Sequence, residues 1–255
     1  MLSWNHPRHP LPLQLVPSNW SPRIKIKIPQ NRQQAILEAS RISTPIVIYT
    51  DGSGHLGGIG AAAVIYHSGE LTHYSQYYLR TTVNHMVYEG ELVGMLLGIS
   101  MLLQVERTIE VVVGVDSQAA IKATKNSSSQ PGCHLLRTIH ECVQQVLESS
   151  PNTTITIQWT PGHEGIEGNE QSDQQAKSAA AGNTTSNTVH PIPLPLLPEG
   201  YLPTSHSASV TAFNATLKQK AATDLTRSPR YHRLKRIDNS FPHPRFMQLV
   251  PKLPR

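Results

Sequence analysis

The chain has 255 residues, two cysteines and a formal net charge of +5. This length allows one domain with appendages or two small domains. No apolar run reaches the roughly 20 residues of a membrane-spanning helix, and residues 1–16 lack the apolar stretch of a signal peptide, so we expect neither membrane contact nor secretion.

The cysteines Cys133 and Cys142 fall on or just before one predicted helix. Their spacing corresponds to about 13 Å along a helix axis. The Cα atoms of a disulfide lie within about 7 Å of each other. We therefore expect two reduced thiols in an intracellular protein, either nuclear or cytoplasmic.

Prolines and charges divide the chain into three parts. The stretch 46–181 holds three of the 20 prolines, while seven precede it and ten follow it. Lys/Arg and Asp/Glu number six and one in residues 1–45, six and 13 in residues 46–181, and ten and three in residues 182–255. An acidic middle part can hold a divalent metal, and basic flanking parts suit a polyanion such as a nucleic acid.

These shifts predict three regions. Residues 1–44 form a basic, proline-rich linker, and residues 45–181 form the folded domain. Residues 182–255 form a basic, proline-rich tail that is partly helical or disordered.

Hydrophobic periodicity places most regular elements in the folded domain. Apolar or alternating runs predict five strands, at 46–51, 60–66, 71–79, 108–115 and 153–159. Three- and four-residue spacing and capping signals predict helices at 84–104, 117–123, 134–148 and 169–181. A short strand at 24–28, between two prolines, and helices at 30–41 and 208–222 are compatible with the pattern outside the domain.

The order of these elements predicts an α/β fold. Strands one to three form an antiparallel meander, whereas helical crossovers make strands four and five parallel to strand one. We expect one mixed five-stranded sheet with helices on both faces. Strands one and four are then neighbours, and their carboxyl ends meet at the edge where ligands bind in open α/β sheets.

An acid ends each of these two neighbouring strands. Either Asp51 or Asp116 alone is readable as a turn residue that caps the following backbone. Side by side, the two carboxylates repel each other unless a cation lies between them. The pair therefore favours a metal site.

The helix at 84–104 adds a third acid. Glu89 and Glu91 are separated by about 200° of helix rotation, so only one of them can face the sheet. Gly94 and Gly98 lie on the face of Glu91 and indicate a close contact with the sheet. We predict that Glu91 points inward and that Glu89 is a solvated helix acid.

The last helix of the domain offers Glu170 and Asp173. Asp173 faces the strand ends if Ala176 and Ala180 pack on the sheet. The alternative is an ordinary helix ion pair between Asp173 and Lys177. Glu170 either shares the face of Asp173 or meets solvent.

Four acids at one edge, with oxygen ligands only, suit Mg²⁺ or Mn²⁺ rather than zinc. Two such ions can activate a water and stabilise the leaving oxygen of a phosphoryl displacement. The glycine-rich loop at 160–168 adds His163. This residue is either a surface histidine or, beside a metal cluster, a proton shuttle or phosphate contact.

Four segments within residues 46–181 carry a family resemblance. They are YTDGSG, YEGELVGMLLG, VGVDSQAA and WTPGHEGIEGNEQSDQQAK. In this order and spacing they resemble type 1 ribonuclease H. The resemblance implies the mixed five-stranded ribonuclease H-like fold and hydrolysis of the RNA strand of an RNA–DNA hybrid. It also implies a two-metal-ion mechanism with water as nucleophile and two Mg²⁺ ions, for which Mn²⁺ can substitute.

Site residues carry over by motif. The metal-binding and catalytic acids are Asp51, Glu91, Asp116 and Asp173, and His163 is the loop histidine that aids turnover. The substrate-binding positions are Gly52, Ser53, Gly54, Ser117, Gln118 and Asn169. Three features depart from the family pattern. The loop at 54–58 lacks the longer Asn-Pro-Gly turn of bacterial members, and Tyr88 replaces an asparagine that touches the hybrid in those members. The loop at 126–132 is short and uncharged where some members carry a basic protrusion.

The tail resembles the stretch that follows this domain in non-LTR retrotransposon polyproteins. The similar segments lie at 202–205, 208–220, 228–231, 237–238 and 253–255. The basic residues Arg227, Arg230, Arg233, Lys235 and Arg236 form either a phosphate-binding patch or a solvated basic linker.

The sequence therefore favours a monomeric Mg²⁺-dependent endoribonuclease that acts on RNA–DNA hybrids, with basic arms available to other nucleic acid. Two further hypotheses stay open. One is a non-catalytic module of the same fold that binds nucleic acid. The other is a different nuclease on this fold, such as an integrase or a Holliday-junction resolvase.

Overall fold

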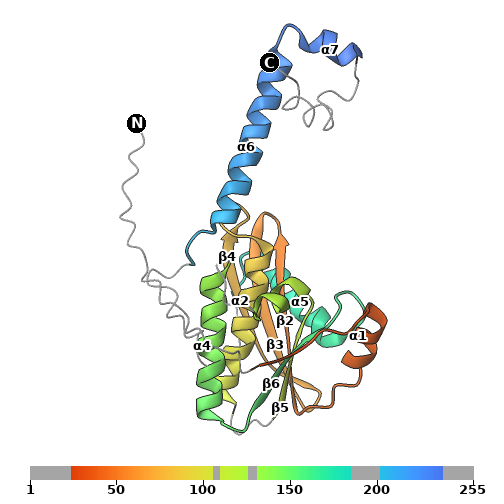
Figure 1. The fold of residues 1–255 in the computed structure, drawn as a ribbon, viewed down its shortest axis with the longest axis vertical. Coiled ribbons are helices and arrows are strands. Elements are labelled where there is room, and N and C mark those ends of the chain that lie inside the picture. Colours follow the sequence, from red (N-terminus) through yellow and green to blue (C-terminus); the bar gives the residue numbers. More distant parts are fainter. Residues whose placement is uncertain (1–23, 106–109, 126–130, 185–201, 238–255) are drawn as a thin grey trace. The chain divides into compact units, whose positions relative to one another are not determined.

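The computed structural model describes residues 24–105, 110–125, 131–184 and 202–237 (Figure 1). In chain order the elements are β1 (Lys25–Lys27), α1 (Arg32–Ala39), β2 (Ile46–His55), β3 (Gly58–His67), β4 (Glu70–Thr81), α2 (Val87–Met101), a 3₁₀ turn (Leu102–Gln104), β5 (Glu110–Val115), α3 (Gln118–Ala123), α4 (Cys133–Ser149), β6 (Thr154–Trp159), α5 (Glu167–Ala180), α6 (His206–Arg227) and α7 (Tyr231–Ile237). The chain divides into one unit up to Ala208 and a second from Ser209.

The first unit is built on one mixed sheet with strand order β1-β6-β5-β2-β3-β4. The strands β2, β3 and β4 form an antiparallel meander, and β5 and β6 run parallel to β2. The predicted α/β topology is confirmed. The predicted strand number of five was one too low, because β1 pairs in parallel with β6.

The sixth strand shows how a segment between prolines can still join a sheet. Residues Lys25 to Lys27 pair with Thr156 to Gln158, and β1 lies at the edge of the sheet. Pro29 lies two residues beyond the end of β1, so its missing N–H does not interrupt this pairing. Part of the predicted linker thus contributes to the sheet.

Strand β2 continues past the acid that was expected to end it. Its parallel pairing with β5 stops at Thr50, but its antiparallel pairing with β3 continues to His55. Leu56 and Gly57 make the turn, with φ values of 50° and 80°. Asp51 therefore lies within a long hairpin strand, at the point where the parallel neighbour ends.

Helices cover both faces of the sheet. Consecutive strand residues point to opposite faces. A Cβ on Gly98 of α2 would lie 2.7 Å from Ile48, whereas a Cβ on Gly168 of α5 would lie 2.1 Å from the Tyr49 ring. Thus α2 lies on one face and α5 on the other, and α4 packs beside α2 (Figure 1).

Helix α2 is the central helix of the core. Thirteen of its residues are buried, which places apolar side chains around its whole circumference. Among the described residues, the stretch Val87–Gln104 alone is long and apolar enough to span a membrane, but 78% of it is buried in this fold. Both cysteines are free: Cys133 is exposed, and Cys142 is buried on α4.

Residues from the predicted tail pack against the domain. Leu202 is 5% exposed and belongs to the main hydrophobic core, and Ala208 is fully buried. The Ser205 N–H donates to the Asn84 carbonyl at 2.8 Å. The described chain therefore returns to the first unit after residue 201.

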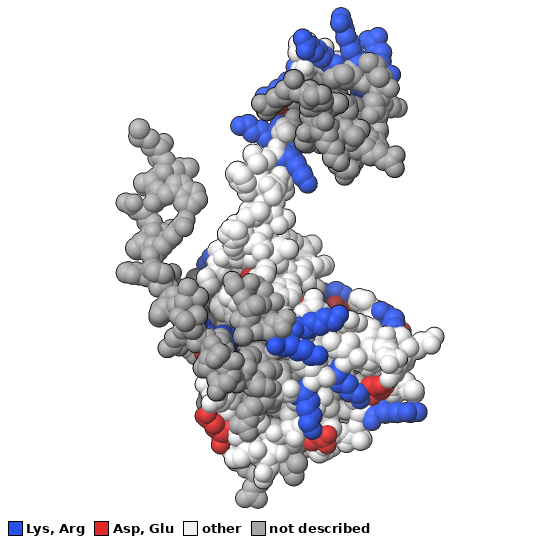
Figure 2. Space-filling model, in the orientation of Figure 1, with Lys and Arg blue, Asp and Glu red and all other residues white. Residues whose placement is uncertain are grey.

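The second unit contains most of α6, together with α7. Seven Lys/Arg and one acid lie between residues 209 and 237. Five of the basic side chains are exposed near the end of α6 and on α7 (Figure 2), namely Arg227, Arg230, Arg233, Lys235 and Arg236. We call these five residues the C-terminal basic patch. The helix possible at 208–222 is present and longer, whereas the predicted loop at 126–132 lies mostly outside the described residues.

Candidate active site

The two strand acids lie where β2 and β5 stop pairing. Thr50 and Val115 are the last pair of these two strands, and Asp51 and Asp116 directly follow them. Asp51 is 7% exposed, and Asp116 is partly buried. The Trp159 indole N–H donates to the Asp116 carbonyl at 3.0 Å and ties this point to the end of β6. The topology brings the two acids together as predicted.

Helix α2 approaches this point because glycines line the contact. A Cβ on Gly52 would lie 2.1 Å from the Glu91 nitrogen, and a Cβ on Gly94 would lie 2.8 Å from the Asp51 carbonyl oxygen. Any larger residue at either position would push the helix away from the strand. The contact turns Glu91 toward the acids, where it is 8% exposed. The position of a Cβ on Gly52 is thus occupied by the backbone of α2.

The three carboxylates form one group. Asp51, Glu91 and Asp116 each offer an oxygen, and these oxygens lie within 4.8 Å of one another. Burial, followed by the charges of Asp116 and Asp173, raises the pKa of Asp51 to about 7. Burial and the neighbouring acids also raise the pKa of Glu91 well above its ordinary value. The group is therefore electrostatically strained when its members are ionised.

Two oxygens of this group lack protein partners. Glu91 Oε2 and Asp116 Oδ1 are buried and accept no hydrogen bond. Buried polar atoms without partners are uncommon and costly. Carboxylate oxygens with free lone pairs are the ligands that Mg²⁺ and Mn²⁺ prefer. The residues present therefore fit a hard divalent cation.

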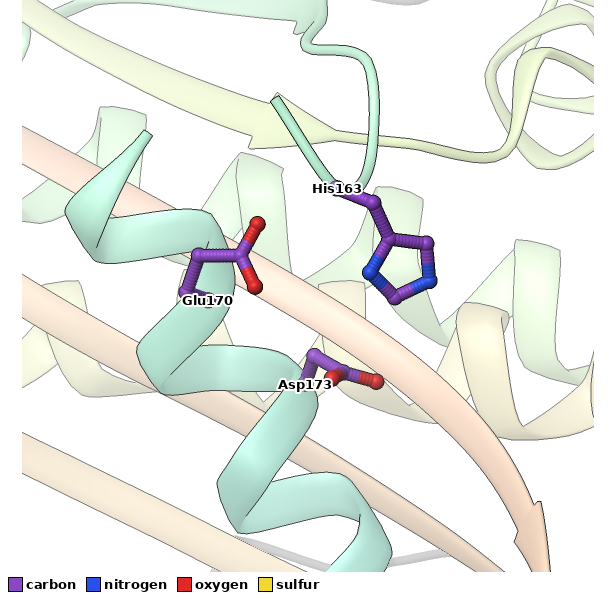
Figure 3. A group of neighbouring side chains, drawn as sticks. All are labelled: His163, Glu170 and Asp173. Carbon is purple, nitrogen blue, oxygen red and sulfur yellow. The ribbon is translucent and has the colours of Figure 1, made fainter. Parts of the chain in front are cut away.

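A second group lies on α5 and the loop before it. His163, Glu170 and Asp173 also offer atoms within 4.8 Å of one another. Figure 3 shows Glu170 and Asp173 projecting from the same side of α5 toward His163. Lys177 donates to Asp173 at 2.6 Å, so the helix ion pair considered for Asp173 is present. The charge of Asp173 contributes to the raised pKa values of Asp51 and Asp116, although Asp173 itself belongs to the second group.

The loop that carries His163 lies against Asp116. A Cβ on Gly162 would lie 2.9 Å from Asp116 Oδ2, and His163 has a left-handed φ of 58°. Asn169 is 4% exposed, and its buried Oδ1 has no partner. Its amide lies 3.8 Å from the same Cβ position on Gly162, so Asn169 borders the acid group.

The other predicted substrate positions lie around this group with different exposure. Gly52 and Ser53 are buried, and Gly54 is exposed. Ser117 caps α3 by accepting from the Ala120 N–H at 3.3 Å. Gln118 is partly exposed and accepts from Lys122 at 3.3 Å. Gly54 is therefore the exposed member of this set, and Ser117 and Gln118 are partly exposed.

Glu89 is buried, and the prediction of a solvated helix acid was wrong. Its side chain is 3% exposed and contacts His85 at 3.3 Å. It accepts the Met86 N–H at 3.0 Å. Burial acts to raise its pKa, but hydrogen bonds from His85, Met86 and Ser205 hold the pKa below its ordinary value. The rotation argument correctly placed Glu89 and Glu91 on different faces of α2. The face that carries Glu89 is covered by the segment 202–208, which returns to the domain and which we call the returning segment.

Arg32 is a contact that the sequence did not reveal. Its Nη2 donates to the Gly162 carbonyl at 2.8 Å, and its Nε donates to the Glu164 carboxylate. These residues are 130 or more positions apart in the chain. No motif or spacing links them, so only the fold shows the contact.

Comparison with known proteins identifies the family. A family model described as RNase H matches residues 43–181, which is more than half of the chain. The chain belongs to the RNase H family. Membership makes it a ribonuclease H, and the matched residues contain both groups of acidic side chains.

Solved structures of RNase H enzymes are similar at low identity. The N-terminal RNase H domain of rv2228c from Mycobacterium tuberculosis is 18% identical, with 53% of this chain and 98% of that chain covered and a TM-score of 0.42. RNase H1 from Halobacterium salinarum is 14% identical (52% and 96% covered, TM-score 0.41). LC11-RNase H1 in complex with an RNA/DNA hybrid is 19% identical (53% and 96% covered, TM-score 0.43). No match was found among curated proteins.

Proposed function

We propose that this ribonuclease H cleaves the RNA strand of RNA–DNA hybrids, with Asp51, Glu91, Asp116 and Asp173 holding two Mg²⁺ ions. The observation that carries the proposal is the group of Asp51, Glu91 and Asp116, with two buried oxygens that no protein donor satisfies. When bound, the ions would lower the pKa of the attacking water and stabilise charge on the phosphate. Mn²⁺ presents the same ligand preference and is expected to substitute.

The chain's own residues supply proton transfer and orientation. His163 lies on the loop beside Asp116, where its imidazole can take up or deliver a proton at the scissile phosphate. The buried Asn169 has an unpartnered amide oxygen and borders the acids. Gln118 and the backbone at Gly54 are accessible for contact with the hybrid. Discrimination of RNA through its 2′-hydroxyl is assigned to Glu91 and this backbone.

The test is cleavage of a hybrid whose RNA strand carries a 5′ label. We expect the purified full chain to cut the RNA strand with Mg²⁺ and to leave 5′-phosphate ends. Asp51→Asn is expected to reduce the rate by about 1,000-fold or more, because it removes a central charge of the acid group. Cleavage that survives Asp51→Asn would contradict the site assignment.

The same assay separates the alternatives. Hybrid binding in a gel shift, without cleavage in either Mg²⁺ or Mn²⁺, would favour a non-catalytic binding module. Cleavage of duplex DNA in place of the hybrid would favour a different nuclease on this fold. Neither outcome agrees with the proposal.

We also propose that the C-terminal basic patch contacts nucleic-acid phosphates. Its five side chains are exposed and make no ion pair among the described residues, so their charges are available to a polyanion. Replacing Arg230, Arg233 and Lys235 by Gln is expected to weaken hybrid binding and to reduce the slope of log K against log [salt] by about two to three. An unchanged slope would show that the patch is a solvated surface.

The origin of the chain is a further proposal. We propose that it derives from a non-LTR retrotransposon polyprotein, supported by the resemblance of the tail segments at 202–205, 208–220 and 228–231. A reverse transcriptase reading frame upstream of the coding sequence is the expected observation. A flanking sequence without one would contradict the proposal.

A further inference from the structure

Arg32, from the N-terminal segment, forms hydrogen bonds with the residues on both sides of His163 in its loop. The Arg32 guanidinium donates to the Gly162 carbonyl at 2.8 Å and to the Glu164 carboxylate. His163 lies between these two residues in the sequence. Its backbone has a φ of 58°, a left-handed conformation that residues with a side chain adopt uncommonly. Arg32 thus contacts the backbone on one side of His163 and the side chain on the other.

Arg32 is itself held in place. Asn31 caps α1 by accepting the Gln34 N–H at 2.9 Å, which fixes the first turn where Arg32 begins the helix. Ala35 and Ala39 are buried, and they lie three and seven positions after Arg32, on the same helix face. That face is therefore turned to the domain, with Arg32 at its N-terminal end.

The segment before α1 adds a second attachment. Strand β1 pairs with β6, whose last residue, Trp159, directly precedes the loop. Lys27 at the end of β1 forms an ion pair with Glu38 of α1 at 3.0 Å. The strand, the helix and the loop are thus joined through the same edge of the sheet.

We propose that Arg32 is a positioning residue for His163, and that the β1–α1 segment braces the active-site loop. The inference rests on the proposed function, because it assigns Arg32 to the turnover step in which His163 acts. The Arg32 and Glu164 side chains are 55% and 28% exposed, and exposed ion pairs contribute little to stability. The proposed role depends on the fork geometry of the guanidinium, which lets Arg32 donate to a carbonyl and a carboxylate at the same time.

The kinetic test is a double-mutant cycle in the full chain, with rates measured over a range of hybrid concentrations that reaches saturation. Arg32→Ala is expected to lower kcat about 5- to 10-fold with KM unchanged within about twofold, since misplacing a catalytic group slows the reaction without weakening binding. Arg32→Lys keeps the charge but not the fork and should give an intermediate kcat. Gln33→Ala, an exposed neighbour on the same helix, is the matched control with unchanged kcat.

The cycle is completed in a His163→Ala background. There, Arg32→Ala should add less than about a twofold further loss, because the two residues act as one unit. Equal losses in both backgrounds, or an unchanged kcat for Arg32→Ala, would overturn the inference.

A second measurement does not depend on activity. Amide hydrogen exchange at residues 162–165 is expected to become faster in Arg32→Ala and to stay at the wild-type rate in Gln33→Ala. Unchanged exchange in Arg32→Ala would overturn the inference even if the hybrid were not a substrate. An inactive wild-type chain whose loop still loosens in Arg32→Ala would instead contradict the proposed function and leave Arg32 as the brace.

Discussion

Helix α2 buries two glutamates that are two residues apart and held in opposite ways. Glu89 accepts from Met86, contacts His85 and is hydrogen-bonded to Ser205, and its pKa is lowered. Glu91 faces Asp51 and Asp116, leaves one buried oxygen without a partner, and has a raised pKa. A satisfied buried carboxylate stabilises the fold, whereas an unsatisfied group of carboxylates stores charge repulsion that a cation can relieve. The contrast separates a structural acid from a functional one on the same helix.

The largest expected effect concerns cleavage. Glu91→Gln should lower hybrid cleavage by about 1,000-fold, because it removes a charge from the acid group. Glu89→Gln should cleave at a rate within about threefold of the wild type, because Glu89 faces the other side of the helix. Steady-state rates in Mg²⁺ measure both variants. Equal losses of cleavage rate in the two variants would contradict the assignment of Glu91 as the functional acid and Glu89 as the structural one.

The next effect is the pH dependence of stability without metal. Because the folded pKa of Asp51 is raised to about 7, its carboxyl contributes most to stability below its ordinary pKa, and this contribution is lost as the pH rises through 7. The loss between pH 4 and 8 has an upper limit on the order of 4 kcal/mol. Urea unfolding in EDTA at several pH values measures it.

Two controls test the cause of this loss. Asp51→Asn should reduce the pH dependence, because one titrating carboxyl is gone while Glu91 and Asp116 remain. Mg²⁺ should restore stability to the wild type at pH 8, because a ligand that binds only the folded state stabilises it. A wild-type protein that becomes more stable between pH 5 and 8 in EDTA, by an amount that Asp51→Asn does not alter, would contradict the raised pKa.

A smaller effect is expected for the free energy of unfolding of Glu89→Gln. The amide keeps the shape but loses the charge that accepts from Met86 and His85, so we expect a loss of about 1–3 kcal/mol. Glu91→Gln should not destabilise the metal-free protein, since it relieves repulsion. Urea denaturation in EDTA compares the two directly, and a less stable Glu91→Gln would contradict the contrast.

The smallest effect tests the returning segment. Ser205→Ala removes a hydrogen bond to Glu89 and the cap that accepts from the Ala208 N–H, and should cost about 1 kcal/mol. Ser207→Ala, two residues along, is the matched control and should have little effect on the melting temperature. Equal melting temperatures for Ser205→Ala and the wild type would show that this segment does not support α2.

The sequence predicted the parts of the fold and site that rest on local pattern. The hydrophobic runs gave the order of the meander and the parallel strands, and the glycines at 94 and 98 correctly identified the inward face of α2. The meeting of Asp51 and Asp116 followed from topology alone. These features need only periodicity and the handedness of crossovers.

The parts that the sequence did not reveal depend on distant partners. Glu89 reads as a surface acid until Ser205, more than 100 residues later, covers it. Arg32 reads as one charge in a basic linker until the sheet brings it to Gly162. Strand β1 has only three residues, so its hydrophobic pattern gives a weak signal for pairing with the sheet. Neither propensity nor motif encodes such long-range contacts.

Mg²⁺ binding tests the central contrast most directly. Isothermal titration of Mg²⁺ into the wild type, Glu89→Gln and Glu91→Gln compares the two acids without relying on cleavage. We predict that Glu89→Gln binds Mg²⁺ as the wild type does and that Glu91→Gln binds at least about tenfold more weakly. Weaker binding by Glu89→Gln, together with wild-type binding by Glu91→Gln, would contradict the assignment of Glu91 to the metal site.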